Sequence, residues 1–270
     1  MPITLSALNI YPVKGLQAIA LDHALCTARG LQYDRRFMVV DGEGEFLTQR
    51  VHPRMATVWT ELRDGLLTLS APDAGAVDVP LEPAGAATMR VRVWNSVCDA
   101  VPASAAADAW LSGYLGLPCR LVYMPEQAKR YSNPQYAGPE RLVSFADGYA
   151  FLMIGEASLG DLNRRLAARA HAALPMNRFR PSLVVSGSEP YAEDGWKELR
   201  IGEAAFRAAK PCGRCQVTTT DQATGEVRGP EPLATLATYR ESPEFGVMFG
   251  MNLVSVKPGA VRLGDPVELA

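Results

Sequence analysis

Glycine and proline interrupt this chain so often that long helices have little room to form. The 270 residues include 23 glycines and 20 prolines, which divide the chain into short segments. Three pairs of segments flank turn sequences: 35–40 and 46–49 around "DGEG", 58–62 and 66–70 around "RDG", and 89–94 and 97–101 around "NS". These pairs predict antiparallel hairpins. Their repetition predicts a curled or closed sheet that leaves few strand edges open.

Helical patterns are scarcer and fall in two places. Residues 104–116 carry an apolar stripe with Ser104 as a candidate N-cap and Gly116 as the residue that ends the helix. Residues 155–173 carry leucines at i, i+3 and i+7, with charged residues on the opposite face. The pattern predicts one helix in each segment.

A segment rich in Pro, Gly, Asn and Ser at residues 124–148 separates the first set of strands from the next. Further strands are predicted at residues 151–154, 182–185, 198–201, 204–208, 215–220 and 261–263. We place a domain boundary at the start of the connecting segment, with domains at 1–125 and 126–270. The expected class is α+β and β-rich, with an N-terminal β-barrel-like domain and a second β-rich domain with a few helices.

The net charge and the composition limit the kinds of binding partner and the cellular compartment that can be expected. A formal net charge of −2 gives no reason to expect nucleic acid as a partner. No run of about 18 apolar residues is available to span a membrane, and the N-terminus resembles a strand more than a signal peptide. Five cysteines without a framework spacing fit a reducing compartment. We therefore expect a cytoplasmic protein.

A C-x-x-C pair, Cys212 and Cys215, is the most distinctive chemical feature. A structural zinc site needs four ligands, and the other cysteines and the three histidines supply no second pair. A thioredoxin-like redox pair needs a helix after its first cysteine, whereas "QVTTTD" predicts a strand. Lys210 and Arg214 would stabilise a thiolate at Cys215, which is a soft metal ligand. Two solvated basic residues beside a strand are the alternative, and Cys212 is expected to be structural.

Basic residues recur just before or after predicted strands. They are Lys14 in "YPVKGL", Arg35 and Arg36 in "YDRRFMVV", and Arg178 and Arg180, with Asn177, in "MNRFRPSLVV". Arginine binds phosphate through two parallel hydrogen bonds, so a phosphate-bearing ligand is expected. The glycine-rich phosphate loops and the serine-hydrolase and metalloprotease motifs are missing from the sequence.

Several motifs, in order, resemble a known family. "RCQVTTTDQATGE", "EPLATLATYR" and "FGMNLVSVKPGAVRLGDPVEL" are similar to the core signature of MOSC-domain proteins. "YPVKGL", "YDRRFMVVDGEGEFLTQR" and "DAWLSGYLG" are similar to the N-terminal MOSC β-barrel domain that precedes it. The likeness extends to the mitochondrial amidoxime-reducing component and its bacterial relatives. It implies a MOSC-type β-barrel domain at 126–270.

The resemblance also implies a molybdenum cofactor and the residues that bind it. Cys215 corresponds to the thiolate ligand of molybdenum, and Asp221 is a candidate proton donor. The expected cofactor-binding residues are Lys14, Gly15, Arg36, Ser144, Asn177, Arg178, Arg180, Arg214 and Cys215. Gly15 replaces a serine that is common in the family, which leaves only backbone N–H groups there.

The implied reaction reduces N-hydroxylated compounds: R–NH–OH, two electrons and two protons give R–NH₂ and water. Amidoximes, hydroxylamines and N-hydroxylated bases are the expected small-molecule substrates. Electrons would come from a separate flavin or iron–sulfur protein. The alternative is a molybdenum-cofactor carrier or sulfur-relay protein that binds the pterin without reductase turnover.

Overall fold

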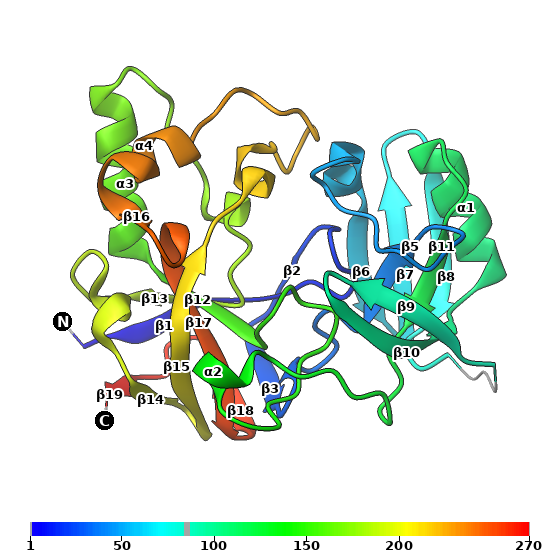
Figure 1. Ribbon diagram of the computed structural model, residues 1–270, viewed down its shortest axis with the longest axis horizontal. Helices are drawn as coiled ribbons and strands as arrows, with labels where there is room; N and C mark the ends of the chain where they lie inside the picture. The colour runs from blue at the N-terminus through cyan, green and yellow to red at the C-terminus, as the bar shows by residue number, and fades with distance from the viewer. Residues whose placement is uncertain (1, 84–86, 270) are drawn as a thin grey trace.

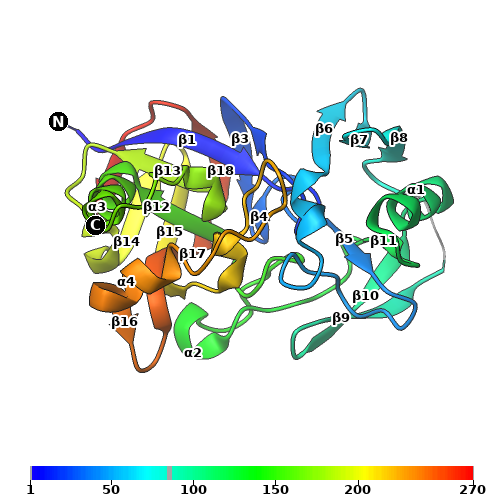
Figure 2. The same ribbon diagram turned by 90° about the horizontal axis from the view of Figure 1, so that it is seen from above.

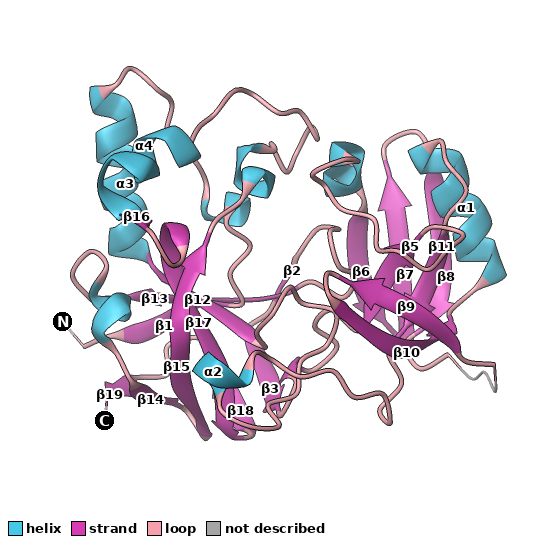
Figure 3. Ribbon diagram, in the orientation of Figure 1, coloured by secondary structure: helices cyan, strands magenta, loops and turns pink. Residues whose placement is uncertain are grey.

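The chain folds into two β-rich halves that lie side by side (Figures 1 and 2) in the computed structural model, which describes residues 2–83 and 87–269. Strands dominate both halves and helices are few (Figure 3). The β-rich α+β class expected from the sequence is confirmed. Within the described residues, no helix is long and apolar enough to cross a membrane.

The half on the right of Figure 1 contains two antiparallel sheets and a covering helix. One sheet has the order β5 (Phe37–Val40), β11 (Arg120–Tyr123), β10 (Ser96–Pro102), β9 (Met89–Val93). The other has the order β6 (Trp59–Arg63), β7 (Leu66–Ala71), β8 (Gly75–Pro80). Helix α1 (Ala105–Leu115) buries Leu111 and Tyr114 in a core shared with both sheets, and the 3₁₀ helix η1 (Pro53–Thr57) adds Met55.

Turn residues fix these hairpins as the sequence predicts. The β6–β7 turn uses Asp64 and Gly65, both with positive φ (51° and 78°), which suits the twist of the paired strands. The β9–β10 hairpin also forms where predicted. The first pair is shorter than expected, because only Phe46 forms a ladder bridge to β5, at Val40.

The caps of α1 act as predicted. The Ser104 hydroxyl accepts a hydrogen bond from the Ala107 N–H at 3.3 Å, and Gly116 ends the helix in the left-handed conformation with φ 75°. The second predicted helix is α3 (Glu156–Ala168), which buries Leu162 and Leu166.

The half on the left of Figure 1 is built around one large sheet. Its order is β19 (Val267–Leu269), β14 (Glu198–Ile201), β15 (Ala204–Gly213), β17 (Gly246–Lys257), β12 (Phe151–Gly155), β13 (Leu183–Ser186), β1 (Thr4–Ile10), β2 (Ile19–Ala20), with β16 (Glu241–Ser242) beside β17. A smaller sheet has the order β18 (Gly259–Arg262), β3 (His23–Thr27), β4 (Gly30–Leu31). The remaining helices are α2 (Pro134–Ala137), α4 (Leu233–Arg240), and the 3₁₀ helices η2 (Met176–Arg178), η3 (Ala192–Gly195) and η4 (Gln216–Thr219).

The first strands of the chain pair with strands from its second part. β1 is antiparallel to β13, and β3 is antiparallel to β18. Residues 4–10 therefore add a strand to a sheet formed mainly by residues beyond 150, and residues 23–27 and 30–31 form a small sheet with β18. The domain boundary at residue 125 stays a prediction. It divides the chain in sequence, whereas β1 and β3, which precede it, are hydrogen-bonded to strands that follow it.

One predicted strand is wrong. Residues 215–220 form no strand, because the chain turns into the 3₁₀ helix η4 directly after Cys215. Two hydroxyls stabilise the turn: Thr218 Oγ1 donates to the Cys215 carbonyl at 2.9 Å, and Thr219 Oγ1 donates to the Gln216 carbonyl at 2.7 Å. β-Branched side chains here bond to their own backbone instead of packing on a sheet. The preceding strand β15 is longer than the predicted 204–208 and reaches Gly213.

Candidate functional site

A pocket between the two halves collects most of the chemically distinctive side chains. Residues 48–50 and Trp94 line it from the right half, and residues 212–215, Val217 and Asn252 line it from the left half. Its charged lining residues are Lys14, Arg35, Arg50, Arg180, Arg214 and one carboxylate, Asp147. Cations outnumber the carboxylate five to one among these described residues, so the pocket suits an anionic occupant.

Cys215 lies at this pocket because β15 ends just before it. Both Cys212 and Cys215 are free, partly exposed thiols that line the pocket. Between them, Arg214 Nη1 donates to Cys212 Sγ at 3.1 Å, and Arg214 Nη2 donates to the Phe179 carbonyl at 2.6 Å. The Arg214 Nε is buried without a hydrogen-bond partner in the described structure. One donor of this guanidinium therefore remains available beside the two thiols.

Gly213 allows the backbone to pass close to the loop opposite. A Cβ added at Gly213 would lie 2.2 Å from the Phe245 carbonyl oxygen. The close approach holds the end of β15 in place before Cys215, so the glycine tightens this loop.

Two arginines enclose an aromatic ring on one side of the pocket. The guanidinium carbons of Arg35 and Arg180 lie 4.1 Å and 4.2 Å from the centroid of the Tyr11 ring. Both arginines have positive φ, 49° and 57°, a backbone conformation that costs energy in a non-glycine residue. Arg35 Nη1 donates to buried Asp34 at 2.6 Å. Burial lowers the pKa of Arg180 to about 10, which still leaves it charged at neutral pH.

Lys14 and Asp147 form an ion pair at the pocket, and the Trp94 indole N–H also donates to Asp147, at 3.1 Å. Burial lowers the pKa of Lys14, and the charge of Asp147 opposes that shift. Removal of water would raise the pKa of Asp147, but the charge and hydrogen bond of Lys14 outweigh this and hold it below its usual range. Asp147 is therefore ionised at neutral pH.

A pair of buried amides joins the two halves behind Lys14. Gln49 Nε2 donates to Gln222 Oε1 at 3.1 Å, and Gln222 Nε2 donates to Gln49 Oε1 at 3.0 Å. Gln49 Nε2 also donates to the Gly15 carbonyl at 2.7 Å, and Arg180 Nη1 donates to Gln222 Oε1 at 3.1 Å. The network orients the turn at Gly15, whose φ is +84°.

Five of the predicted site residues come together in this pocket: Lys14, Gly15, Arg180, Arg214 and Cys215. The other five do not line it: Arg36, Ser144, Asn177, Arg178 and Asp221.

The first two of these outer residues belong to the connecting segment and its surroundings. Arg36 donates to the Met124 carbonyl, the Tyr123 hydroxyl and Glu126. Ser144 is buried, and its carbonyl accepts a hydrogen bond from Arg130.

The last three residues also lie outside the pocket lining. Asn177 lines a separate groove between β1 and α3. Arg178 donates to the Thr219 carbonyl at 2.8 Å and pairs with Asp221 at 3.3 Å. Asp221 also accepts the Ala223 N–H at 2.9 Å, a local turn bond. Arg178 and Asp221 therefore support η4 from outside the pocket.

The lining residues that sequence reasoning missed include Arg50, Trp94, Asp147 and Tyr149. Arg35, noted only as a basic residue beside a strand, also lines the pocket. A tryptophan in a hairpin turn and an arginine after "LTQ" were the only available signals. Neither indicates a pocket without the tertiary contacts.

Known proteins match this chain over nearly its whole length. Residues 2–118 match the MOSC N-terminal beta barrel domain and residues 140–268 match the MOSC domain. Mitochondrial amidoxime-reducing component 1 is 36% identical in Mus musculus and 34% identical in Homo sapiens, each alignment covering 98% of this chain and 82% of the relative. Molybdenum cofactor sulfurase of Oryza sativa subsp. japonica is 34% identical over 93% of this chain and 32% of its own length.

The names of the mouse and human relatives place those proteins in mitochondria, and a cytoplasmic location for this chain stays a prediction.

The two domain matches and the relatives agree with the order of motifs and with the β-rich halves around the pocket. The chain therefore belongs to the MOSC-domain family, in the group that carries an N-terminal MOSC β-barrel domain and includes the mitochondrial amidoxime-reducing components.

Proposed function

We propose that this protein is a molybdenum-cofactor-dependent reductase of N-hydroxylated compounds. The observation that carries the proposal is a free thiol, Cys215, in a pocket whose lining cations outnumber its carboxylates five to one. Relatives named amidoxime-reducing components support the reaction class.

The pocket fits the chemistry of this cofactor. A pterin dithiolene with a phosphate carries several negative charges, which cations in a partly buried site must offset. Cys215 would ligate the metal, and Lys14, Arg180 and Arg214 would face the anionic groups, with Gly15 offering its backbone N–H. The unpartnered Nε of Arg214 is a buried donor that a ligand acceptor would satisfy. When bound, the cofactor supplies the two-electron redox chemistry.

The chain's own residues supply charge, position and protons. Cys215 supplies the sulfur that would ligate a metal, as a free thiol at the pocket. Reduction of R–NH–OH to R–NH₂ and water also needs two protons. Asp147 is ionised at neutral pH, while burial raises the pKa of Tyr149 to about 12, so this phenol stays protonated. Tyr149 lines the pocket and is the proposed proton donor. Asp221, outside the pocket, is a positioning residue for η4.

The electron pair would come from a separate flavin or iron–sulfur protein, and the substrate would be an amidoxime, a hydroxylamine or an N-hydroxylated base. A carrier or sulfur-relay role is the second candidate. It is favoured by the similarity of 93% of this chain to part of a molybdenum cofactor sulfurase. A carrier would hold metal and pterin without turnover.

The test compares the native chain, Cys215→Ser and the matched control Cys212→Ser, each produced in a host that makes the cofactor. Molybdenum is measured by elemental analysis and pterin by fluorescence after oxidation. Turnover of benzamidoxime is measured with reduced methyl viologen. We expect Cys215→Ser to lose at least about 100-fold in activity or metal content, beyond the range for supporting residues, and Cys212→Ser to keep both.

Metal and pterin without turnover in the native chain would favour the carrier. Equal metal content and turnover in native protein and Cys215→Ser would contradict the assignment of Cys215. Native protein without metal would contradict the cofactor itself.

A further inference from the structure

Arg50 differs from every other cation that lines the pocket. Lys14, Arg35, Arg180 and Arg214 each donate at least one side-chain hydrogen bond to an acceptor of the protein. The Arg50 side chain makes no hydrogen bond or ion pair with any other described residue, although it lines the same pocket. Its N–H donors therefore remain available for an occupant.

Trp94 holds the Arg50 guanidinium in place by its ring face. The guanidinium carbon lies 4.2 Å from the centroid of the Trp94 ring. Phe46 packs against the ring at 4.7 Å between centroids, and the indole N–H donates to Asp147. A guanidinium stacked on an aromatic face keeps its in-plane N–H groups free for acceptors. Trp94 thus orients Arg50 without occupying its donors.

Both residues are held at the pocket by other parts of the molecule. The Arg50 carbonyl accepts a hydrogen bond at 3.1 Å from Nε2 of Gln216, the residue after Cys215. Trp94 has a φ of 54°, in the left-handed region that is unfavourable for a bulky residue. The fold maintains this conformation and brings the Arg50–Trp94 pair to the Cys215 loop.

We propose that Arg50 is an anion-binding residue for the occupant of this pocket, and that Trp94 is its positioning residue. Arg50 takes a phosphate or carboxylate oxygen. That oxygen belongs to the cofactor's phosphate or to an anionic substituent of the substrate, and this identification rests on the proposed function. The proposal that Arg50 binds an anion does not rest on the proposed function.

The first arm uses the full chain produced without cofactor and inorganic phosphate as the probe. Arg50→Gln should weaken phosphate binding about 10-fold, as expected for loss of one hydrogen bond to a charged group. The matched control is Arg54→Gln, because Arg54 stacks on Tyr114 at the same 4.2 Å but does not line the pocket. Arg54→Gln should bind phosphate like the native chain.

The second arm distinguishes the two sources of the anion in cofactor-loaded protein. If Arg50 binds the cofactor's phosphate, Arg50→Gln loses molybdenum and pterin. If it binds the substrate, metal content is kept and KM rises for 4-carboxybenzamidoxime but not for benzamidoxime. Either result supports the proposal.

The third arm tests Trp94. Trp94→Leu should reproduce the weaker phosphate binding of Arg50→Gln, whereas Trp94→Phe, which keeps an aromatic face, should have a smaller effect. Urea unfolding confirms that each variant is folded.

The proposal is overturned if Arg50→Gln matches the native chain and Arg54→Gln in phosphate affinity, metal content and both KM values. Because phosphate titration requires neither metal nor turnover, failure of the reductase assignment would leave its outcome unchanged.

Discussion

At the scale of single residues, the pocket separates groups that carry charge from groups that can deliver a proton. The ion pair with Lys14 and the hydrogen bond from the Trp94 indole N–H keep the Asp147 carboxylate ionised. The Tyr149 phenol has a raised pKa of about 12, caused first by burial and then by the neighbouring Tyr136 and Cys212. An ionised carboxylate has no proton to donate, whereas the Tyr149 phenol lines the pocket and carries one that it can donate to a departing hydroxyl.

Tyr149→Phe tests this assignment. We expect kcat to fall by about 100-fold, the lower range for loss of a general acid, with metal content unchanged and KM nearly unchanged. The control is Tyr136→Phe, because the Tyr136 hydroxyl donates to Glu244 outside the pocket. Native-like kcat in Tyr149→Phe across pH 6 to 9 would show that the proton comes from elsewhere.

At the scale of elements, the short helix η4 determines where Cys215 lies. Its threonines bond back to the chain, and Arg178 binds the Thr219 carbonyl from behind. The Cys215 loop is therefore fixed by local hydroxyl contacts and one buried arginine, without a strand ladder. A loop of this kind holds a ligand at a defined place while leaving its thiol accessible.

Thr218→Val removes one of these hydroxyls and keeps the side-chain shape. It should lower the free energy of unfolding by about 1 kcal/mol and also lower cofactor content. Thr238→Val removes the same kind of bond away from the pocket, since Thr238 Oγ1 donates to the Thr235 carbonyl in α4 at 2.7 Å. Thr238 is exposed whereas Thr218 is buried, so urea unfolding should show a smaller loss in Thr238→Val. If Thr218→Val keeps native cofactor content, η4 does not position Cys215.

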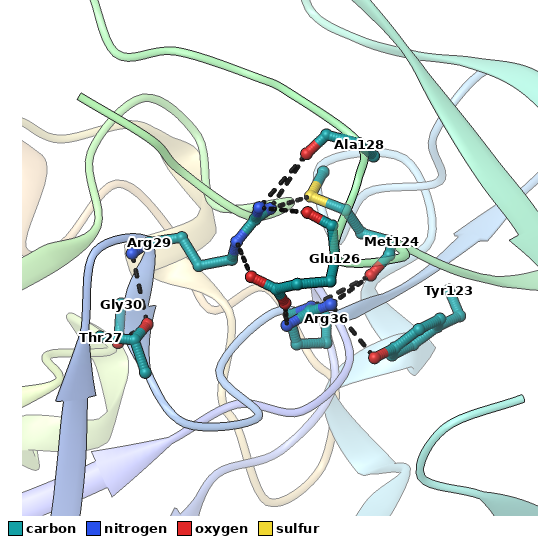
Figure 4. A network of polar contacts seen from close by, with 8 residues as sticks. All are labelled: Thr27, Arg29, Gly30, Arg36, Tyr123, Met124, Glu126 and Ala128. Atoms are coloured by element: carbon teal, nitrogen blue, oxygen red, sulfur yellow. Dashed lines mark hydrogen bonds and ion pairs between the residues drawn. The ribbon is translucent and has the colours of Figure 1, made fainter. Parts of the chain in front are cut away.

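At the scale of the whole molecule, two arginines hold the connecting segment between the halves (Figure 4). Arg29, in the β3–β4 turn, donates to the carbonyls of Glu126 and Ala128, at 2.9 Å and 3.3 Å. Arg36, beside β5, donates to the Met124 carbonyl and to the Glu126 carboxylate. One segment thus receives donors from residues next to strands of both halves, and the pocket lies between those halves.

Arg29→Met should loosen this segment more than Glu126→Gln does. Arg29 is buried, so its loss leaves the two carbonyl acceptors unsatisfied and should cost about 2–4 kcal/mol. The Glu126 side chain is 73% exposed, and its ion pairs should contribute less than about 1 kcal/mol. Urea unfolding and trypsin cleavage after exposed Lys129 measure both effects. Equal cleavage rates in the two variants would contradict the conclusion that Arg29 holds the connecting segment in place.

The sequence by itself determined the features that depend on neighbouring residues. Asp64 and Gly65 specify a tight turn, and Ser104 and Gly116 delimit α1, because backbone conformation and capping act over a few residues. Local preference also misled, since the β-branched run after Cys215 predicted a strand. Its threonine hydroxyls satisfy the backbone of η4 instead.

Only the tertiary structure decided which charges share the pocket. Arg35 lines it whereas its neighbour Arg36 binds the connecting segment, a difference that depends on which way each side chain leaves the β5 edge. Arg50, Trp94 and Asp147 are separated by about 50 residues each. Arg50 and Trp94 meet within the right half, and Asp147 joins them from the end of the connecting segment. Such contacts depend on packing between residues far apart in the sequence, so local sequence patterns cannot predict them.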